Sequence, residues 1–325
     1  KSVTHETFCY TQGIKKQNIG VQMYLGAASM IGATGSNGSD NGIPKDFDIL
    51  TFSNDDLAEV SNIGYTVHNL VIYNPDLISE KVISDLKENF KNNSLIIGQT
   101  NGAYGGGLVS PDESVRTKAI EFVKKMCGIT SKIGAPNTYL RPGSVNPDGP
   151  WLPHNENHTK EVFDRLVDST RRIASSAEDE GVMLSLEGGY VSPIYSAKIT
   201  RDFIDAVNSK NLGFNQDPVN FIHSLEQAYN TKDFLEDFFS LLGDKTLGAH
   251  LKDFTVVDTL LLRFEEEYLG KGMMDQAYFL KRMNEVCPDG HVLVEHIPRD
   301  KFEPSYHETI KYSEKANISW QNFGG

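Results

Sequence analysis

Four residues with metal-binding side chains stand at the ends of successive apolar runs. The runs and their polar residues are Met-Leu-Ser-Leu-Glu187, Gly-Phe-Asn-Gln-Asp217, Gly-Ala-His250-Leu and Val-Leu-Val-Glu295. They are separated by 30, 33 and 45 residues, and each interval is close to the length of one strand–helix unit. If the runs are neighbouring parallel strands, their ends meet at one edge of the sheet, and the four side chains lie together.

Such a group of side chains predicts a bound cation. Three carboxylates at close range repel one another and raise each other's pKa, and a dication removes that conflict. Three oxygen ligands and one imidazole nitrogen suit one divalent metal. The excess of carboxylates favours Mn²⁺, while Mg²⁺, Co²⁺ and Zn²⁺ remain open.

The elements that must position these residues follow an alternating pattern. Short apolar runs alternate with longer helical stretches, which is typical of βα units and a parallel sheet. Helices are expected over 114–134 and 160–180. Strands are expected at 95–98, 138–141, 182–186, 212–215, 247–251 and 292–294.

The first 90 residues are harder to assign. One strand is expected at 19–24, and a second at either 47–52 or 69–73, while the Gly/Ser/Asn-rich stretch 32–42 is typical of a loop. With one of those alternatives the strand count reaches eight. No linker or internal repeat divides the chain, so we expect an α/β fold, a (β/α)₈ TIM barrel, as a single domain over residues 1–325.

Composition limits the partners and the compartment. The net charge of −13 disfavours a nucleic-acid partner, and no apolar run approaches the length of a membrane span. Three widely spaced cysteines form no disulfide framework or zinc motif, which favours a cytoplasmic location. The chain begins at Lys1 with no recognisable signal peptide, so secretion is disfavoured.

A long loop after strand 138–141 supplies further candidates. It runs from Arg141 to His158 and carries four prolines after the arginine. Arg141 is a candidate for substrate binding, and Trp151 for stacking on a sugar face or an aromatic aglycone. His154 is a candidate catalytic acid or base near neutral pH. The alternatives are that Trp151 fills the end of the barrel and that His154 bonds a loop carbonyl.

A glycine run follows strand 95–98. Tyr104 precedes Gly105, Gly106 and Gly107. Phosphate-binding motifs with the required glycine and lysine spacing are absent from the sequence, so a loop that closes over substrate is the favoured interpretation.

The order of the metal-ligand candidates resembles the xylose isomerase-like barrel superfamily of sugar isomerases and epimerases. Supporting motifs are His250-Leu-Lys252-Asp, Gly270-Lys-Gly and Leu140-Arg-Pro-Gly-Ser, and the resemblance covers residues 95–297. It implies one metal held by the four residues above. It also implies that Glu187 and Glu295 transfer the proton, and the chemistry agrees, because moving a proton beside a carbonyl takes two carboxylates near the carbon.

Departures from the ketose 3-epimerases of that superfamily concern substrate binding. Pro193, Asn220 and Val256 occupy the positions where those enzymes carry Glu, His and Arg to hold a free ketose. A plain ketose 3-epimerase is therefore disfavoured. Asn220 and Lys252 remain substrate-binding candidates, and Lys252 is alternatively a support for the metal ligands.

Several functions stay open at this point. The first is a metal-dependent sugar isomerase or epimerase acting through an enediolate. A looser resemblance is to the large subunit of C-glycoside deglycosidases, which implies C–C cleavage of a 3-keto C-glycoside and a small β-sandwich partner subunit. A decayed sugar-binding protein is a third, and a DNA-repair endonuclease is disfavoured by charge and by the single histidine ligand. The expected ligand is a sugar or glycoside, and the expected protein partner is either a second copy of the chain or the small β-sandwich subunit.

Overall fold

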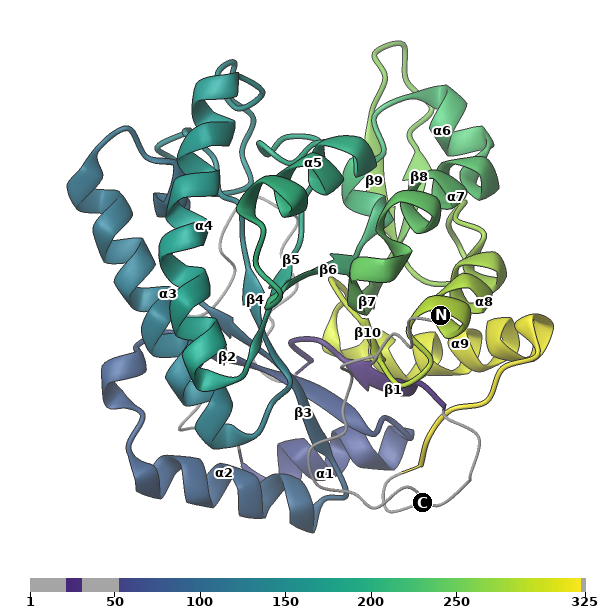
Figure 1. The fold of residues 1–325 in the computed structure, drawn as a ribbon. Coiled ribbons are helices and arrows are strands. Elements are labelled where there is room, and N and C mark those ends of the chain that lie inside the picture. The colour runs from purple at the N-terminus through teal and green to yellow at the C-terminus, as the bar shows by residue number, and fades with distance from the viewer. Residues whose placement is uncertain (1–21, 31–52, 323–325) are drawn as a thin grey trace, which may run out of the picture.

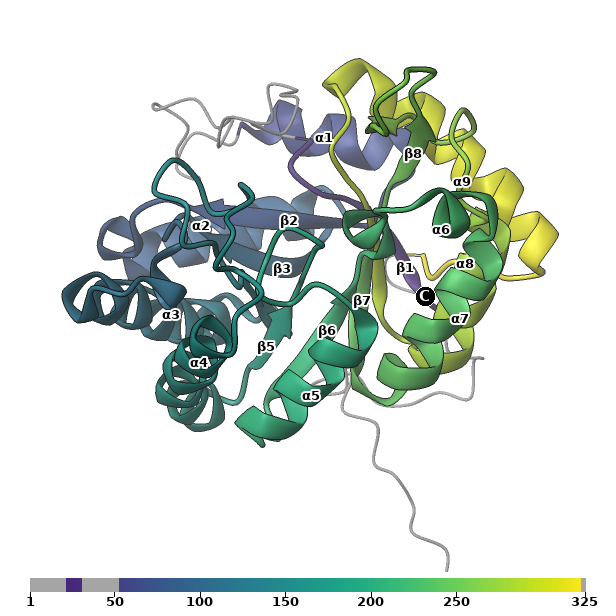
Figure 2. The ribbon, with the colours of Figure 1, turned by 90° about the horizontal axis from the view of Figure 1, so that it is seen from above.

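The structure, a computed structural model, describes residues 22–30 and 53–322. Eight parallel strands close into a barrel in the order β1-β10-β7-β6-β5-β4-β3-β2 (Figures 1 and 2). Their bounds are β1 Tyr24–Ala27, β2 Val67–Ile72, β3 Ile96–Gly102, β4 Asn137–Leu140, β5 Met183–Leu186, β6 Leu212–Gln216, β7 Thr246–Leu251 and β10 His291–Val294. The predicted (β/α)₈ barrel is confirmed.

Helices surround the barrel in the expected alternation (Figure 2). They are α1 Asn54–Ile63, α2 Glu80–Asn92, α3 Glu113–Ile133, α4 Lys160–Glu180, α5 Ala197–Val207, α6 Leu225–Tyr229, α7 Thr231–Leu242, α8 Gln276–Val286 and α9 Phe302–Ala316. In α4 the Thr159 side chain accepts the Val162 N–H at the start, and Gly181 ends the helix at a φ of 68°. Glycine suits that end because a left-handed φ costs it no steric strain.

The predicted elements agree with the structure from residue 95 onward, with shifts of a residue or two at most starts and a later end for β3. Of the two alternatives for the second strand, 69–73 overlaps β2, and 47–52 lies wholly outside the described residues. Of the strand expected at 19–24, residues 19–21 lie outside the described residues. Strand β1 begins at Tyr24 and runs to Ala27, so the expected end is three residues too early. The predicted loop 32–42 lies outside the described residues.

Strand register places the metal-ligand candidates at one level. Glu187 follows β5 directly, and its N–H donates to the Leu140 carbonyl at the end of β4. Glu295 follows β10, and its N–H donates to the carbonyl of Leu251 at the end of β7. Each parallel ladder thus continues one residue past the strand and holds the carboxylate backbone in place.

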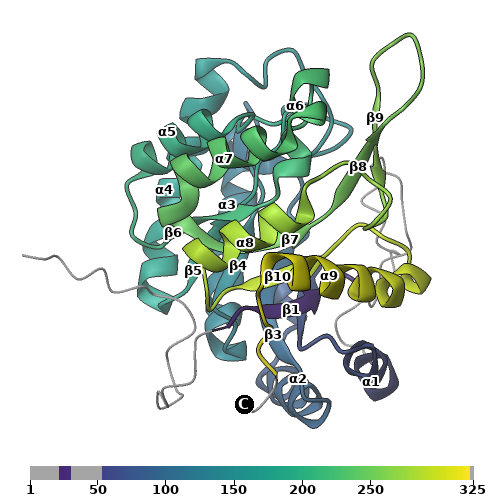
Figure 3. The ribbon, with the colours of Figure 1, turned by 90° about the vertical axis from the view of Figure 1, so that its right-hand side faces the viewer.

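A two-stranded hairpin, which the sequence did not predict, follows β7. Strands β8 (Asp253–Val256) and β9 (Phe264–Glu267) pair antiparallel and project from the barrel (Figure 3). Buried Phe254 anchors its base in the main core, whereas Leu260 at its tip is fully exposed. Within the described part of the chain, none of the helices has the length and apolar character needed to cross a bilayer.

Candidate metal centre

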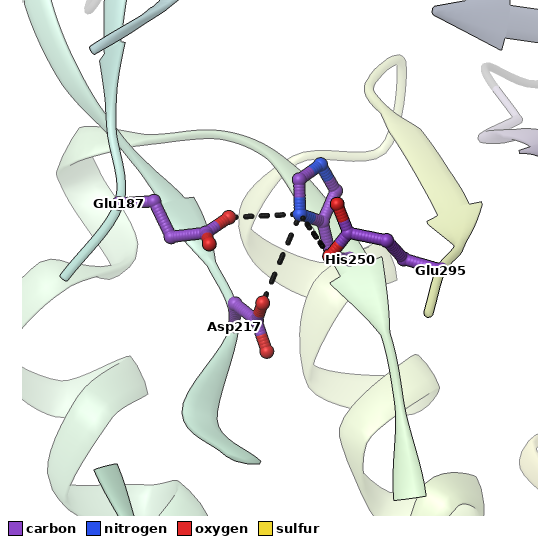
Figure 4. Close-up of side chains that lie close together, drawn as sticks. All are labelled: Glu187, Asp217, His250 and Glu295. Carbon is purple, nitrogen blue, oxygen red and sulfur yellow. Dashed lines mark ion pairs between the residues drawn. The ribbon is translucent and has the colours of Figure 1, made fainter. Parts of the chain in front are cut away.

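The four predicted ligands converge at the carboxyl-terminal end of the barrel (Figure 4). His250 Nδ1 lies 2.8 Å from Glu187 Oε2, 3.1 Å from Glu295 Oε2 and 3.8 Å from Asp217 Oδ2. One ligand atom from each residue lies within 4.8 Å of the others. Glu187 and Glu295 approach the imidazole from opposite sides, and three of the four side chains are buried.

Several buried polar atoms of this group make no hydrogen bond. They are Asp217 Oδ1, Glu295 Oε2 and both ring nitrogens of His250. The contact between His250 and Glu187 is short but misses the angle of a hydrogen bond. Buried donors and acceptors are rarely left unsatisfied, so the set fits a divalent cation that would bind all four residues.

A buried ammonium lies beside the same carboxylates. Lys252 Nζ is 2.7 Å from Asp217 Oδ2 and 3.2 Å from Glu295 Oε2. Burial by itself lowers the pKa of Lys252, but the two carboxylates raise that pKa well above its usual range, so the side chain stays charged. Lys252, a candidate for substrate binding or support, is thus placed where it neutralises the ligand set.

The titration of the ligands follows their neighbours. Burial raises the pKa of Glu295, yet His250, His296 and Lys252 together lower it well below the usual value. For His250 burial lowers the pKa, and the surrounding carboxylates raise it well above 6.5. The carboxylates thus favour the protonated imidazole, and a cation competes with that proton for the ring nitrogen.

Amide and hydroxyl groups orient Glu187. The Asn220 Nδ2 group donates to Glu187 Oε1 at 3.0 Å and to Asp217 Oδ2 at 2.9 Å, while Asn220 Oδ1 accepts from Lys252 at 2.9 Å. Asn215 Nδ2 donates to Glu187 Oε2 at 2.8 Å, and the Tyr139 hydroxyl donates to Oε1 at 3.1 Å. Asn220, a predicted substrate contact, therefore uses both ends of its amide on the ligand set.

Two of these positioning residues were missed by the sequence reasoning. Asn215 lies on β6, two residues before Asp217. Tyr139 lies on β4, two residues before Arg141, which follows the strand. Strand side chains alternate faces, so residues two apart point the same way. That spacing was the available signal for both.

Trp151 lies beside the segment that follows Glu187. The ring of Trp151 packs near Gly189, where a built Cβ would lie 3.5 Å from it and 3.1 Å from the Asn220 carbonyl oxygen. His154 Nδ1 accepts the Glu156 N–H at 3.2 Å. Among the described residues, His154 forms no hydrogen bond or ion pair with the metal-ligand set.

The loop itself is held by its own polar side chains. Buried Asn157 accepts the Val145 N–H at 3.0 Å and donates to the Val191 carbonyl at 2.7 Å. The Ser144 hydroxyl donates to the Leu152 carbonyl at 2.7 Å. These bonds give the 141–158 loop a defined shape in place of the secondary structure it lacks.

The hairpin also reaches the site. Glu266 Oε1 of β9 lies 2.7 Å from His296 Nδ1, and His296 Nε2 lies 3.6 Å from Glu295 Oε2. His296 adopts a φ of 58°, which is uncommon for a residue with a side chain. The sequence analysis did not predict this contact, because it did not predict the hairpin.

The comparisons with known proteins agree with this geometry. The sequence model of the family described as "Xylose isomerase-like TIM barrel" matches residues 57–316, and the chain belongs to that family. A search of curated protein sequences found no match.

Solved structures with the same fold include several sugar epimerases. A D-tagatose 3-epimerase-like protein is 18% identical, with a TM-score of 0.67 over 91% of this chain and 98% of its own. A 3-keto-D-glucoside 4-epimerase from E. coli is 15% identical, with a TM-score of 0.63 over 90% and 100%. A xylose isomerase-like TIM barrel protein from Mycobacterium smegmatis, solved in complex with magnesium, is 15% identical, with a TM-score of 0.68 over 90% and 96%.

Proposed function

We propose that the protein is a divalent-metal-dependent sugar isomerase or epimerase that moves a proton beside a sugar carbonyl. The observation that carries this proposal is the set of four converging ligands, in which Asp217 Oδ1, Glu295 Oε2 and both ring nitrogens of His250 make no hydrogen bond. Bound there, a dication would polarise a substrate carbonyl and make the adjacent C–H more acidic. The carboxylate excess favours Mn²⁺.

The chain's own residues then divide the proton transfer. One of Glu187 and Glu295 removes the proton from the carbon next to the carbonyl, and the C–H electron pair forms the enediolate double bond. A proton held by the other carboxylate and delivered to the opposite face of the same carbon gives the epimer. Its delivery to the former carbonyl carbon, while the hydroxyl proton passes to the other oxygen, gives the isomer. The first carboxylate then releases its proton to solvent, and the second takes one up. Their positions on opposite sides of His250 support this division (Figure 4).

In this proposal Lys252 and Asn220 position and balance the metal ligands and do not contact the sugar. The ammonium of Lys252 offsets the negative charge of Asp217 and Glu295. Asn220 fixes the orientation of Glu187. His154 stays a proposed acid or base and Trp151 a proposed stacking surface, because a loop side chain reaches substrate without touching the metal ligands.

A second candidate is C–C cleavage of a 3-keto C-glycoside, as in the large subunit of C-glycoside deglycosidases. Proton removal beside a keto group starts that elimination too, so the same carboxylates serve. One observation favours it: the Asn220 Nδ2 group donates to Glu187 and Asp217, so it is not free to donate to an unmodified ketose. This candidate brings a small β-sandwich partner subunit, whereas the first is compatible with a homo-oligomer.

Exchange in D₂O separates these candidates. Mn²⁺-loaded protein is incubated with ketoses, 3-keto-glycosides and 3-keto C-glycosides, and products are followed by NMR. Deuterium at the carbon next to the carbonyl, with the sugar retained, supports the isomerase or epimerase. Release of a free aglycone supports C–C cleavage. Neither product, together with failure to bind Mn²⁺, would favour a decayed binding protein.

The proposal places the enzyme in the cytoplasm. Cys127 supports this placement, since it is a buried free thiol.

A further inference from the structure

Arg141 is a cation without a counter-charge at the end of the barrel. It follows β4 directly, and its guanidinium makes no hydrogen bond or ion pair with any residue that the structure describes. Its Nε atom is buried. Five N–H donors in a fixed fork normally find acceptors, and a buried donor without one is costly.

The other arginines show how unusual this is. Each donates at least one hydrogen bond from its guanidinium to a carboxylate, a carbonyl or a hydroxyl; they are Arg116, Arg165, Arg171, Arg172, Arg201, Arg263, Arg282 and Arg299. Most of them lie on exposed helices, where water is an alternative partner. Arg141 is half-buried, like several of these arginines, and yet its guanidinium has no partner among the described residues.

Tyrosine rings hold the guanidinium in place. Its Cζ lies 5.4 Å from the ring centre of Tyr104 and 5.8 Å from that of Tyr139. Burial raises the pKa of Tyr73, and the Arg141 charge partly offsets that rise, so the arginine acts on side chains at the ends of β2, β3 and β4. Ring faces stabilise a cation but accept none of its in-plane N–H groups.

The backbone beneath Arg141 is clamped as well. The Tyr104 hydroxyl accepts the Arg141 N–H and donates to its carbonyl oxygen. The two loops approach so closely that a Cβ on Gly143 would lie 2.8 Å from the Gly106 carbonyl oxygen. The glycine run thus packs against the Arg141 loop and helps to hold that loop in place. This role differs from that of the substrate-closing loop expected from sequence.

Charge on the neighbouring strands is already balanced. The three carboxylates of the ligand set would be matched by one dication and the Lys252 ammonium, which leaves no negative charge for Arg141. Tyr139 connects the two regions, because its ring lies beside Arg141 and its hydroxyl donates to Glu187. The guanidinium and the proposed proton-transfer carboxylate are therefore one side chain apart, a spacing that a single sugar can bridge.

We propose that Arg141 binds an anionic group, a carboxylate or a phosphate, carried by the substrate. The substrate class would then be sugar acids or sugar phosphates instead of neutral sugars. That the ligand is a sugar rests on the proposed function, whereas the anion site rests on Arg141 alone. The tyrosine rings do not bond the in-plane N–H groups of the guanidinium. These groups can therefore donate to two oxygens of a carboxylate or phosphate.

Binding to Mn²⁺-loaded protein tests the inference without turnover. Calorimetry compares D-fructose, D-fructose 6-phosphate and D-fructuronate, which differ in a neutral, phosphate or carboxylate group at carbon 6. At least one anionic ligand should bind about 10-fold to 100-fold more tightly than fructose, and which one does identifies the source of the anion. In Arg141→Gln this preference should fall to near unity, and in Arg141→Lys it should be intermediate.

The controls separate the possible causes. Arg171→Gln, on the exposed face of α4, should keep the preference. Circular dichroism and Mn²⁺ content report whether each variant folds and loads metal; if Arg141→Gln does not fold, Arg141→Lys decides. Equal binding of all three ligands by the unmodified protein, or an anion preference that survives Arg141→Gln, would overturn the inference. An anion preference lost in Arg141→Gln, without deuterium exchange, would uphold it and count against the proposed function.

Discussion

The carboxyl-terminal end of the barrel has two unlike halves. In one half, three carboxylates, an imidazole and an ammonium lie within ion-pair distance of one another. They come from β7 and from the residues that directly follow β5, β6, β7 and β10. After β2, β3 and β4, one guanidinium lies among tyrosine rings and has no counter-charge among the described residues. The first half balances its charges internally once a dication binds, and the second offers a charge that none of the described residues matches.

This difference separates two tasks that a barrel end must perform. A reacting centre needs groups whose charges are fixed against one another, so that protons move between defined positions. A recognition site needs a group left unsatisfied until the ligand arrives. Changes in the two halves should therefore have different consequences, and the following variants test the division.

The largest effect is expected from the two carboxylates of the metal half. Glu187→Gln and Glu295→Gln, made separately, should each lower turnover about 10⁴-fold, because each removes an acid or base as well as a ligand charge. Thermal unfolding should remain cooperative in both variants. The measurement is deuterium exchange into substrate, with Glu88→Gln on the exposed face of α2 as the matched control. Retained exchange in either variant removes that residue from the proton-transfer pair.

Lys252→Met tests the internal charge balance. In metal-free protein the change leaves Asp217 and Glu295 without the ammonium, and breaking a buried ion pair should lower the free energy of unfolding by about 4 kcal/mol. Saturating Mn²⁺ should restore most of that loss, because the dication supplies positive charge to the same carboxylates. Urea denaturation with EDTA and with Mn²⁺ measures both values, and Lys281→Met on α8 is the control. An equal loss with and without metal would contradict the balance.

The two halves were not equally predictable from sequence. The metal ligands are polar residues at the ends of apolar runs, one per βα unit, and that pattern is visible without coordinates. Their neighbours were harder to find, because Asn215 and Tyr139 look like ordinary strand residues until the register shows which face they share. Arg141 was a candidate from its loop, but its missing counter-charge depends on every surrounding chain segment.

The fold shows a similar contrast. Helix α4 was predicted to the residue, since an N-capping Thr159 and a terminal Gly181 mark both ends. The expected end of β1 was too early because its flanks carry no comparable end signal. The hairpin β8–β9 was missed because Glu265, Glu266 and Glu267 form an exposed strand without apolar alternation, and only pairing with β8 makes it one.

Asp253, which lies close to the metal ligands in sequence, is a buried carboxylate that pairs with no cation among the described residues. It can therefore be compared with the charge-balanced carboxylates of the metal half. Burial raises its pKa from 3.8 to about 6, although the Phe254 and Met274 N–H groups donate to it. A raised pKa in the folded state stabilises the fold fully below pH 3.8, and that stability is lost as the pH rises through about 6. The wild type should therefore lose about 2 kcal/mol relative to Asp253→Asn between pH 4 and pH 7.

Chemical denaturation of both proteins at each pH measures this difference. Asparagine keeps an oxygen that can accept the same two N–H groups, and contributions from other titrating residues cancel in the comparison. A constant difference across the range would show that Asp253 has a partner in solution that neutralises its charge.

The smallest effect concerns Tyr139, the one described side chain that touches both halves. Tyr139→Phe removes the hydroxyl that donates to Glu187 and keeps the ring beside Arg141. The loss of one hydrogen bond to a carboxylate should reduce turnover about fivefold to tenfold, or about 1 kcal/mol, through a less well-oriented Glu187. The anion preference should stay within about twofold, since ring and guanidinium are unchanged. Kinetics and ligand calorimetry on one preparation measure both, with exposed Tyr229→Phe as the control. A fall in anion preference with unchanged turnover would reverse the assignment, and Tyr139 would then belong to recognition instead of proton transfer.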